Sequence, residues 1–212
     1  MSPTVFAAFS ENDFAAAELN HHIWQRAEAA AISRYWSGQA APAGRGFEAR
    51  LIWSTSSLYV RFDTVQSEPL IVSVAANLDS KTIGLWDRDV CEIFIAPDRT
   101  EPRRYIELEI APNGEWLDLA IDSTSGERET DWSYNSGMET FARIEEGKIT
   151  MAIKIPWKAL GQEPSAGNRW LGNLFRCVGA GPDRGYQALN PTETETPNFH
   201  MPEKFVEFEF KK

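Results

Sequence analysis

The sequence predicts an all-β protein: a single antiparallel β-sandwich of the immunoglobulin or jelly-roll kind, with short helical turns. Three observations predict this fold. Apolar and polar residues alternate with a period of two over many short segments, turn residues separate these segments, and no long segment has the apolar spacing of a helix. We expect one domain over residues 1–212, in which residues 1–45 form an N-terminal extension that packs on the sandwich.

The elements are expected in the following order. Residues 12–33 are rich in Ala, Glu and Leu but poorly spaced for a helix, so only short helical turns are expected there, and residues 40–46 form a loop. The expected strands cover residues 47–53, 58–62, 71–74, 90–95, 105–110, 116–121, 140–144, 148–155, 170–178 and 205–210. Asn113-Gly114 predicts a tight turn, and Pro156 opens one helical turn over residues 156–160.

Composition and charge narrow the possible functions. The chain carries 21 basic and 31 acidic residues, a net charge of -10, so it repels phosphate backbones and no nucleic-acid partner is expected. Every apolar run falls short of the ~20 residues that a membrane span needs. The N-terminus lacks the basic and apolar regions of a signal peptide, which predicts a cytoplasmic protein, or a secreted or periplasmic one if the chain is a processed form.

The two cysteines, Cys91 and Cys177, lie in apolar runs and are expected to be buried free thiols, with one disulfide as the alternative. The chain also has 8 Trp residues. Because Trp is large and usually anchors a core or a ligand, this number of Trp residues calls for an explanation.

Two segments combine charge with apolar surroundings. Trp86 precedes a strand in which Glu92 stands among apolar residues, and a carboxylate there is costly unless it is paired or lines a cleft. Arg176 stands near the middle of another apolar strand and needs an acceptor, for which Glu92 is a candidate. Alternation puts Leu174 and Arg176 on one face of that strand and Phe175 on the other. The structural alternative is that Trp86 packs at a rim and Glu92 forms an ion pair.

A third polar and aromatic region precedes the last strand, over residues 186–192 and 198–202. Its single histidine, His200, is expected to be a hydrogen-bonded structural residue.

The order of these motifs resembles the carbohydrate-binding module family 9-like domains, which are β-sandwiches of the wider DOMON-like group. The matching residues are Trp86, Asp89, Glu92, Pro97, Asp98, Tyr105, Glu107, Glu109, Pro112, Gly114, Ile155, Pro156, Trp157, Asn173, Arg176, Phe199, His200, Pro202, Glu203 and Phe205.

The resemblance implies a non-catalytic domain, of a bacterial kind related to xylan or cellulose, that binds a sugar or glycan end. Trp86 would stack on the sugar ring, while Glu92 and Arg176 would bond its hydroxyl groups. Leu189 stands where the family has a second Trp, and Tyr186 or Phe199 is a candidate replacement.

The resemblance also implies a possible structural calcium ion, for which Asp87, Asp89 and Asp118 are weak candidate ligands because the regular calcium-loop spacing is missing. Three other functions stay open. One is a glycoside hydrolase that uses two carboxyl groups, and another is a haem-binding domain with Met or His ligands. The third is a protein-interaction sandwich with a degenerate sugar site, which Leu189 favours.

Overall fold

The computed structural model describes residues 3–212, which form thirteen strands and several short helical turns. The strands are β1 (Thr4–Phe9), β2 (Ala30–Ile32), β3 (Phe47–Trp53), β4 (Ser57–Thr64), β5 (Val90–Ala96), β6 (Arg104–Ile110), β7 (Trp116–Asp122), β8 (Glu129–Asp131), β9 (Glu139–Glu145), β10 (Lys148–Pro156), β11 (Arg169–Val178), β12 (Gly185–Ala188) and β13 (Val206–Lys211). The helical turns are η1 (His22–Gln25), η2 (Ala43–Arg45), η3 (Leu85–Asp87), α1 (Trp157–Leu160), η4 (Gly181–Asp183) and η5 (Pro202–Lys204).

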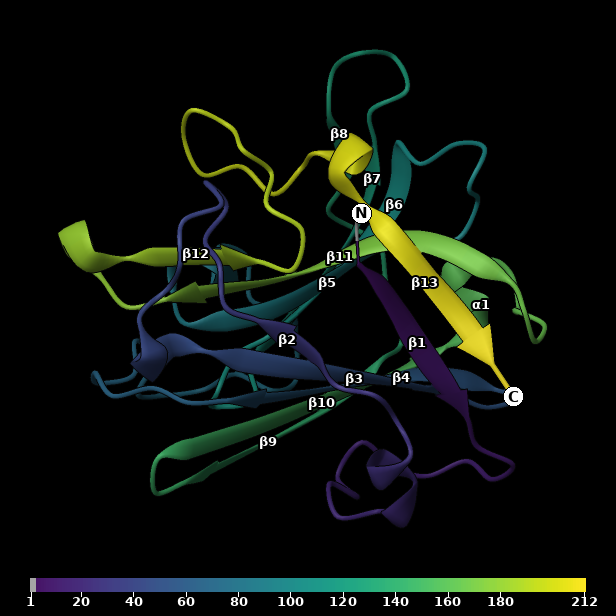
Figure 1. The fold of residues 1–212 in the computed structure, drawn as a ribbon, viewed down its shortest axis with the longest axis horizontal. Coiled ribbons are helices and arrows are strands. Elements are labelled where there is room, and N and C mark those ends of the chain that lie inside the picture. Colours follow the sequence, from purple (N-terminus) through teal and green to yellow (C-terminus); the bar gives the residue numbers. More distant parts are fainter. Residues whose placement is uncertain (1–2) are drawn as a thin grey trace.

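The strands form one sheet that curls into the two layers of a β-sandwich, as predicted. Its order is β8-β7-β6-β5-β11-β13-β1-β3-β4-β10-β9, with β12 paired to β11 and β2 to β3. Most pairs are antiparallel, but β1 runs parallel to both of its neighbours, β13 and β3. Figure 1 shows β1 beside β13, where the curled sheet passes from one layer to the other.

The main core lies between the two layers. Leu51, Val60 and Ile153 come from the layer of β3, β4 and β10, while Ile93 and Leu108 come from the layer of β5 and β6. The strands β3, β4, β5 and β10 contribute every second residue to this core, because successive side chains point to opposite faces. The other residues of β5, β6, β7 and β11 therefore face outward, and there they form a second apolar cluster.

The second cluster determines where the site lies. It contains Phe94, Tyr105, Leu119 and Phe175, and the chain after β12 covers it with Phe199 and other side chains. A third cluster, around Phe14 and Trp24, covers the outer face of β3 and β4. Each layer thus has apolar residues on both faces, which explains why β5 is buried along its whole length.

Most expected elements are confirmed, and the segment 47–53 has the bounds of β3. The expected strand over residues 71–74 is wrong. The Ile71 amide donates to the Asp89 carboxylate instead of to a neighbouring strand, and Val74 is fully exposed. The segment 71–74 is a loop because its apolar residues have no layer to pack against.

The expectation for the N-terminal segment also needs correction. Residues 1–45 are expected to form an extension that packs on the sandwich, and Phe14 and Trp24 do pack on its outer face, but β1 lies between β13 and β3 as an internal strand. The short strands β8 and β12 were likewise not expected from the sequence. In contrast, Cys91 and Cys177 are buried and free, as expected.

The helical turns are short, and among the described residues none forms a helix long and apolar enough to cross a membrane.

Candidate functional site

A cavity of about 330 Å³ lies on the outer face of the β5-β6-β7-β11 layer, within the second apolar cluster. This volume is at the lower end of the range of small-molecule sites, about 300–1,000 Å³. The residues that line the cavity are Trp86, Asp87, Glu92, Phe94, Glu107, Leu119, Ile121, Arg128, Thr130, Trp132, Cys177, Tyr186, Pro197, Asn198, Phe199 and His200.

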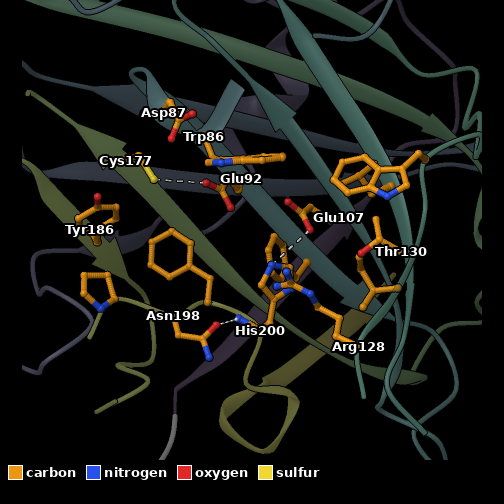
Figure 2. Close-up of a pocket in the computed structure, with 16 residues that line it drawn as sticks. Trp86, Asp87, Glu92, Glu107, Arg128, Thr130, Cys177, Tyr186, Asn198 and His200 are labelled. Atoms are coloured by element: carbon orange, nitrogen blue, oxygen red, sulfur yellow. Dashed lines mark hydrogen bonds and ion pairs between the residues drawn. The ribbon is translucent and has the colours of Figure 1, made fainter. Parts of the chain in front are cut away.

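Three glutamates meet at the floor of the pocket. Glu92 of β5 stands directly opposite Glu109 of β6, and Glu107 lies two residues before Glu109 on the same face. All three are buried, and one carboxylate oxygen from each lies within 4.8 Å of those of the other two. Glu92 and Glu107 line the pocket itself. Figure 2 shows these two carboxyl groups between Trp86 on one side and His200 on the other.

Burial raises the pKa of each of these three carboxyl groups, because the charged form loses its hydration. Mutual repulsion adds to this effect: Glu107 raises the pKa of Glu92, and both raise the pKa of Glu109. The only donor bonded to Glu92 among the described residues is the thiol of Cys177, at 3.5 Å. Glu107 Oε2 and both oxygens of Glu109 have no hydrogen-bond partner in that part of the chain.

The pocket floor therefore holds more acceptors than donors. Side by side at this spacing, ionised carboxyl groups repel one another, so a fully ionised floor is disfavoured unless a cation binds. Carboxylate oxygens also suit a hard divalent cation, and this is the group among the described residues that could hold one.

His200 closes one side of the pocket. Its Nδ1 lies 2.9 Å from the Tyr105 hydroxyl, and its backbone amide donates to Asn198 Oδ1 at 3.0 Å. Burial, reinforced by the charge of Arg128, lowers the pKa of His200 to about 3, so the ring is neutral at physiological pH. Its Nε2 lies 3.9 Å from Glu107 Oε2. His200 is a hydrogen-bonded residue, as expected.

Two indole rings border the pocket. Trp86 lies in η3, directly after Gly84, whose left-handed conformation (φ 80°) turns the chain into this helical turn. Trp132 follows β8 and is 51% exposed. The two ring centroids are 6.3 Å apart and the planes are inclined at 48°. Stacking on both faces of a sugar needs roughly 7–8 Å between parallel rings, twice the optimal carbon contact distance. The two indole rings are therefore too close together and too inclined to stack on both faces of one sugar ring, and they form an angled wall on one side of the pocket.

Trp132 was not expected from the sequence. The family resemblance led us to seek a second Trp at Leu189 instead. The only sequence signal for Trp132 is its position between Asp131 and Ser133 in a polar segment, where a large apolar side chain has nothing to pack on.

The expected site residues are divided between two faces. Trp86, Glu92 and Tyr186 line the pocket. Arg176 does not, because it lies on the other face of β11 with Leu174, as the alternation predicts. There its guanidinium donates to the carbonyl groups of Arg45 at 2.8 Å and Val65 at 3.0 Å, and to Gln66 Oε1 at 2.7 Å. The expected pairing of Arg176 with Glu92 is therefore wrong; Glu92 is opposite Phe175 and Glu109.

Leu189 also lies away from the pocket. Its side chain packs against the main core, and its amide donates to the Leu174 carbonyl at 2.9 Å. The position is structural in this chain because the backbone after β12 continues along β11 and turns the side chain inward.

The three weak calcium candidates do not converge. Asp89 accepts hydrogen bonds from the amides of Ile71 and Gly179 and from Gln66. Asp118 pairs with Lys81 at 2.5 Å and accepts from the amide and hydroxyl of Ser136. Asp87 lines the pocket described above. The proposed calcium ligands thus serve separate purposes, and the acidic cluster lies elsewhere, at Glu92, Glu107 and Glu109.

Comparisons with known proteins agree with this architecture. The family model described as "Carbohydrate family 9 binding domain-like" matches residues 17–211. The UPF0462 protein C4orf33 homolog of Danio rerio is 29% identical over 136 residues, which cover 59% of this chain and 61% of that protein. The chain thus spans about three fifths of the length of this curated relative.

Three solved structures have the same fold. A candidate carbohydrate-binding protein from Bacteroides uniformis superimposes with a TM-score of 0.76 at 15% identity, covering 100% of both chains. A family 9 carbohydrate-binding module from Caldicellulosiruptor kristjanssonii, solved in complex with cellotriose, gives a TM-score of 0.69 at 16% identity, covering 99% of this chain and 94% of that one. A glucose complex of a family 9 module from the same organism gives the same TM-score and identity and covers 96% of that chain.

Proposed function

Because the chain belongs to the carbohydrate family 9 binding domain-like family, we propose that it binds a carbohydrate in the pocket bordered by Trp86 and Trp132. The observation that carries this proposal is the combination of two accessible indole rings with buried polar groups behind them. A pyranose offers apolar C–H groups on its faces and hydroxyl groups on its edge, so it needs both kinds of partner. The cavity volume is suited to one terminal sugar ring.

The expected affinity follows from simple magnitudes. Covering about 100 Å² of apolar surface on an indole contributes roughly 2–3 kcal/mol at 25 cal/mol per Å². Each hydrogen bond to a charged group adds roughly 1.5–3 kcal/mol. After the cost of association is subtracted, a dissociation constant between about millimolar and micromolar is expected. Trp132 supports the stronger end, because half of its surface is free to be covered.

Calorimetric titration with glucose and cello-oligosaccharides, chosen from the ligands of the structural relatives, tests the proposal. Wild-type protein is compared with Trp86→Ala and Trp132→Ala. Losing one stacking surface is expected to weaken binding about 30- to 150-fold, which corresponds to the 2–3 kcal/mol above. Trp132 is the safer variant because its half-exposed ring contributes little to the core.

Trp116→Ala is the matched control. Trp116 is also half-buried, lies outside the pocket lining and donates its indole N–H to the Leu78 carbonyl at 3.1 Å. This variant is expected to bind like the wild type. If all three Trp variants bind sugar as tightly as the wild type, the ligand binds elsewhere. If the wild type binds none of the carbohydrates across a broad glycan array, the proposed function is wrong.

A further inference from the structure

The floor of the pocket is short of hydrogen-bond donors. An ionised carboxylate only accepts, and the one side-chain donor outside the cluster that reaches these glutamates among the described residues is the Cys177 thiol. Within the cluster, Glu107 and Glu109 hydrogen-bond to each other when one of them is protonated. Glu107 lines the pocket and is 3% exposed, and its buried Oε2 has no hydrogen-bond partner among residues 3–212, with His200 Nε2 3.9 Å away. A buried acceptor without a donor is costly, so a ligand that supplies donors here gains more than one that supplies acceptors.

The charges around the floor are mainly negative. Asp87 of η3 faces the same pocket, and its charge acts on Glu109. Two arginines offset part of this charge: Arg128 acts to lower the pKa of Glu107, and Arg184 acts to lower the pKa of Glu92, in both cases against the larger raising effect of burial. Arg184 acts on Glu92 from a distance, but its guanidinium donates to the carbonyl groups of Gly179, Trp86 and Arg88.

Two other groups complete the surroundings of the floor. Arg128 is an exposed residue of the segment before β8, so solvent screens it. His200 is neutral because its pKa is lowered to about 3. Four carboxyl groups therefore face the pocket or lie directly beneath it, those of Asp87, Glu92, Glu107 and Glu109. The two cations nearby are Arg128, which solvent screens, and Arg184, which is already bonded to carbonyl groups.

The indole rings suit the same kind of ligand. The face of an indole ring attracts a cation placed within about 6 Å of its centroid. Trp86 and Trp132 border a pocket whose floor is acidic, so a ligand with both a C–H face and a positive charge finds a partner for each. A hydroxyl group offers one donor and also lone pairs, which would face the carboxylate lone pairs. An ammonium group offers three donors and no acceptor.

From this geometry we propose that the pocket selects sugars that carry a free, positively charged amino group, the amino-sugar class, over neutral sugars. The ammonium group would lie against Glu107 and Glu92, with the sugar ring on the indole wall. This proposal rests on the proposed function, since it names which class of carbohydrate that site prefers. The ammonium also favours ionised carboxyl groups, so the floor is expected to release protons when the ligand binds.

Calorimetry with three closely matched sugars tests the proposal: glucosamine, glucose and N-acetylglucosamine, at pH 7 with EDTA present. Glucosamine is expected to bind at least about tenfold more tightly than glucose, because charge-assisted hydrogen bonds are roughly twice as strong as neutral ones. N-acetylglucosamine, in which the amine is uncharged, should lose this advantage. Repeating the titrations in buffers of different ionisation enthalpy should reveal proton release with glucosamine and none with glucose.

Glu107→Gln tests the residue assignment, with the exposed Glu163→Gln as the control. The first change is expected to reduce the ratio of glucosamine to glucose affinity several-fold, and the second to leave both affinities as they are. Equal binding of glucose and glucosamine would overturn the inference while leaving the proposed function intact. Glucosamine binding that is seen without EDTA but lost in its presence would also overturn the inference, because a divalent cation would then be the partner of the acidic floor. Failure of all sugars to bind would overturn both proposals.

Discussion

Replacing Glu109 by glutamine is expected to stabilise the protein, although Glu109 lies in the centre of the sheet. The side chain is 0% exposed, both carboxylate oxygens lack a hydrogen-bond partner among residues 3–212, and Glu92 stands directly opposite. Two like charges opposite each other on adjacent strands destabilise a sheet. Glutamine keeps the shape, removes the charge and supplies an N–H₂ group that can donate to Glu92 or Glu107.

The magnitude follows from the cost of a buried unsatisfied polar group, about 1–3 kcal/mol and more for a charged one. We therefore expect Glu109→Gln to raise the free energy of unfolding by about 1–3 kcal/mol at pH 8. For a domain of 212 residues, 1 kcal/mol corresponds to a change in Tm of about 2–4 °C, so the variant should melt about 2–12 °C higher.

The pH dependence provides a second, independent test. In the folded protein the pKa of Glu109 is raised well above its ordinary value, whereas the unfolded chain titrates near about 4.3. Below that pH the group is protonated in both states and costs nothing. As the pH rises from about 4.3 through the raised folded-state pKa, the unfolded state ionises first and the wild type loses stability. The advantage of the variant should therefore be large at pH 8 and nearly absent at pH 4.

Urea denaturation followed by Trp fluorescence at both pH values is the assay, with Glu163→Gln as the control. Glu163 is exposed, so its replacement should change stability by less than about 0.5 kcal/mol. A Glu109→Gln variant that is less stable than the wild type at pH 8 would refute the reasoning. So would a gain of equal size at pH 4 and pH 8, because the benefit would then not come from removing a charge.

Three further predictions concern other parts of the site and its support. The pKa of His200 is about 3 in the folded protein and about 6.5 in the unfolded chain. Because the unfolded state therefore binds a proton first as the pH falls, the free energy of unfolding of the wild type should drop by about 2 kcal/mol between pH 8 and pH 5 through this group. In urea denaturation at both pH values, His200→Asn should show a correspondingly smaller drop. Arg176→Lys should lower stability by about 2–3 kcal/mol, because lysine cannot hold all of the guanidinium's acceptors, while calorimetry finds the sugar affinity unchanged. Gly172→Ala should lower the free energy of unfolding by about 1–3 kcal/mol, because the added Cβ would lie 2.5 Å from the Phe94 carbonyl oxygen and 2.6 Å from the Phe208 ring. A lower Tm in a thermal melt would show this loss.

Local alternation was sufficient to predict most of the sandwich. The strand over residues 47–53 alternates clearly, because one of its faces packs in the main core. The segment 71–74 shows the limit of this argument: it is apolar enough for a strand, yet Val74 is fully exposed and a side chain, Asp89, binds the Ile71 amide. The placement of β1 was also beyond local pattern, since a six-residue segment does not reveal that it pairs with β13 at the other end of the chain.

The family was correctly predicted from the order of the motifs, and the match of the family's sequence model to residues 17–211 confirms it. The site was only partly predictable. Trp86, Glu92 and Tyr186 come together as expected, but the acidic floor depends on register: Glu109 meets Glu92 only because β5 and β6 pair in that alignment. Trp132 follows a strand of three residues and reaches the pocket through the tertiary fold. Strand alternation alone places Arg176 and Phe175 on opposite faces of β11, and Phe175 is the residue opposite Glu92, so Arg176 faces away from Glu92.

A crystal structure of the protein soaked with glucosamine is the most direct test of the claim that this pocket is a carbohydrate site. We expect the sugar ring to lie against the indole of Trp86 or Trp132, with its amino nitrogen within about 2.7–3.2 Å of a carboxylate oxygen of Glu107 or Glu92. Sugar density at another surface, with the space between the indole rings and the glutamates left to solvent, would contradict the account.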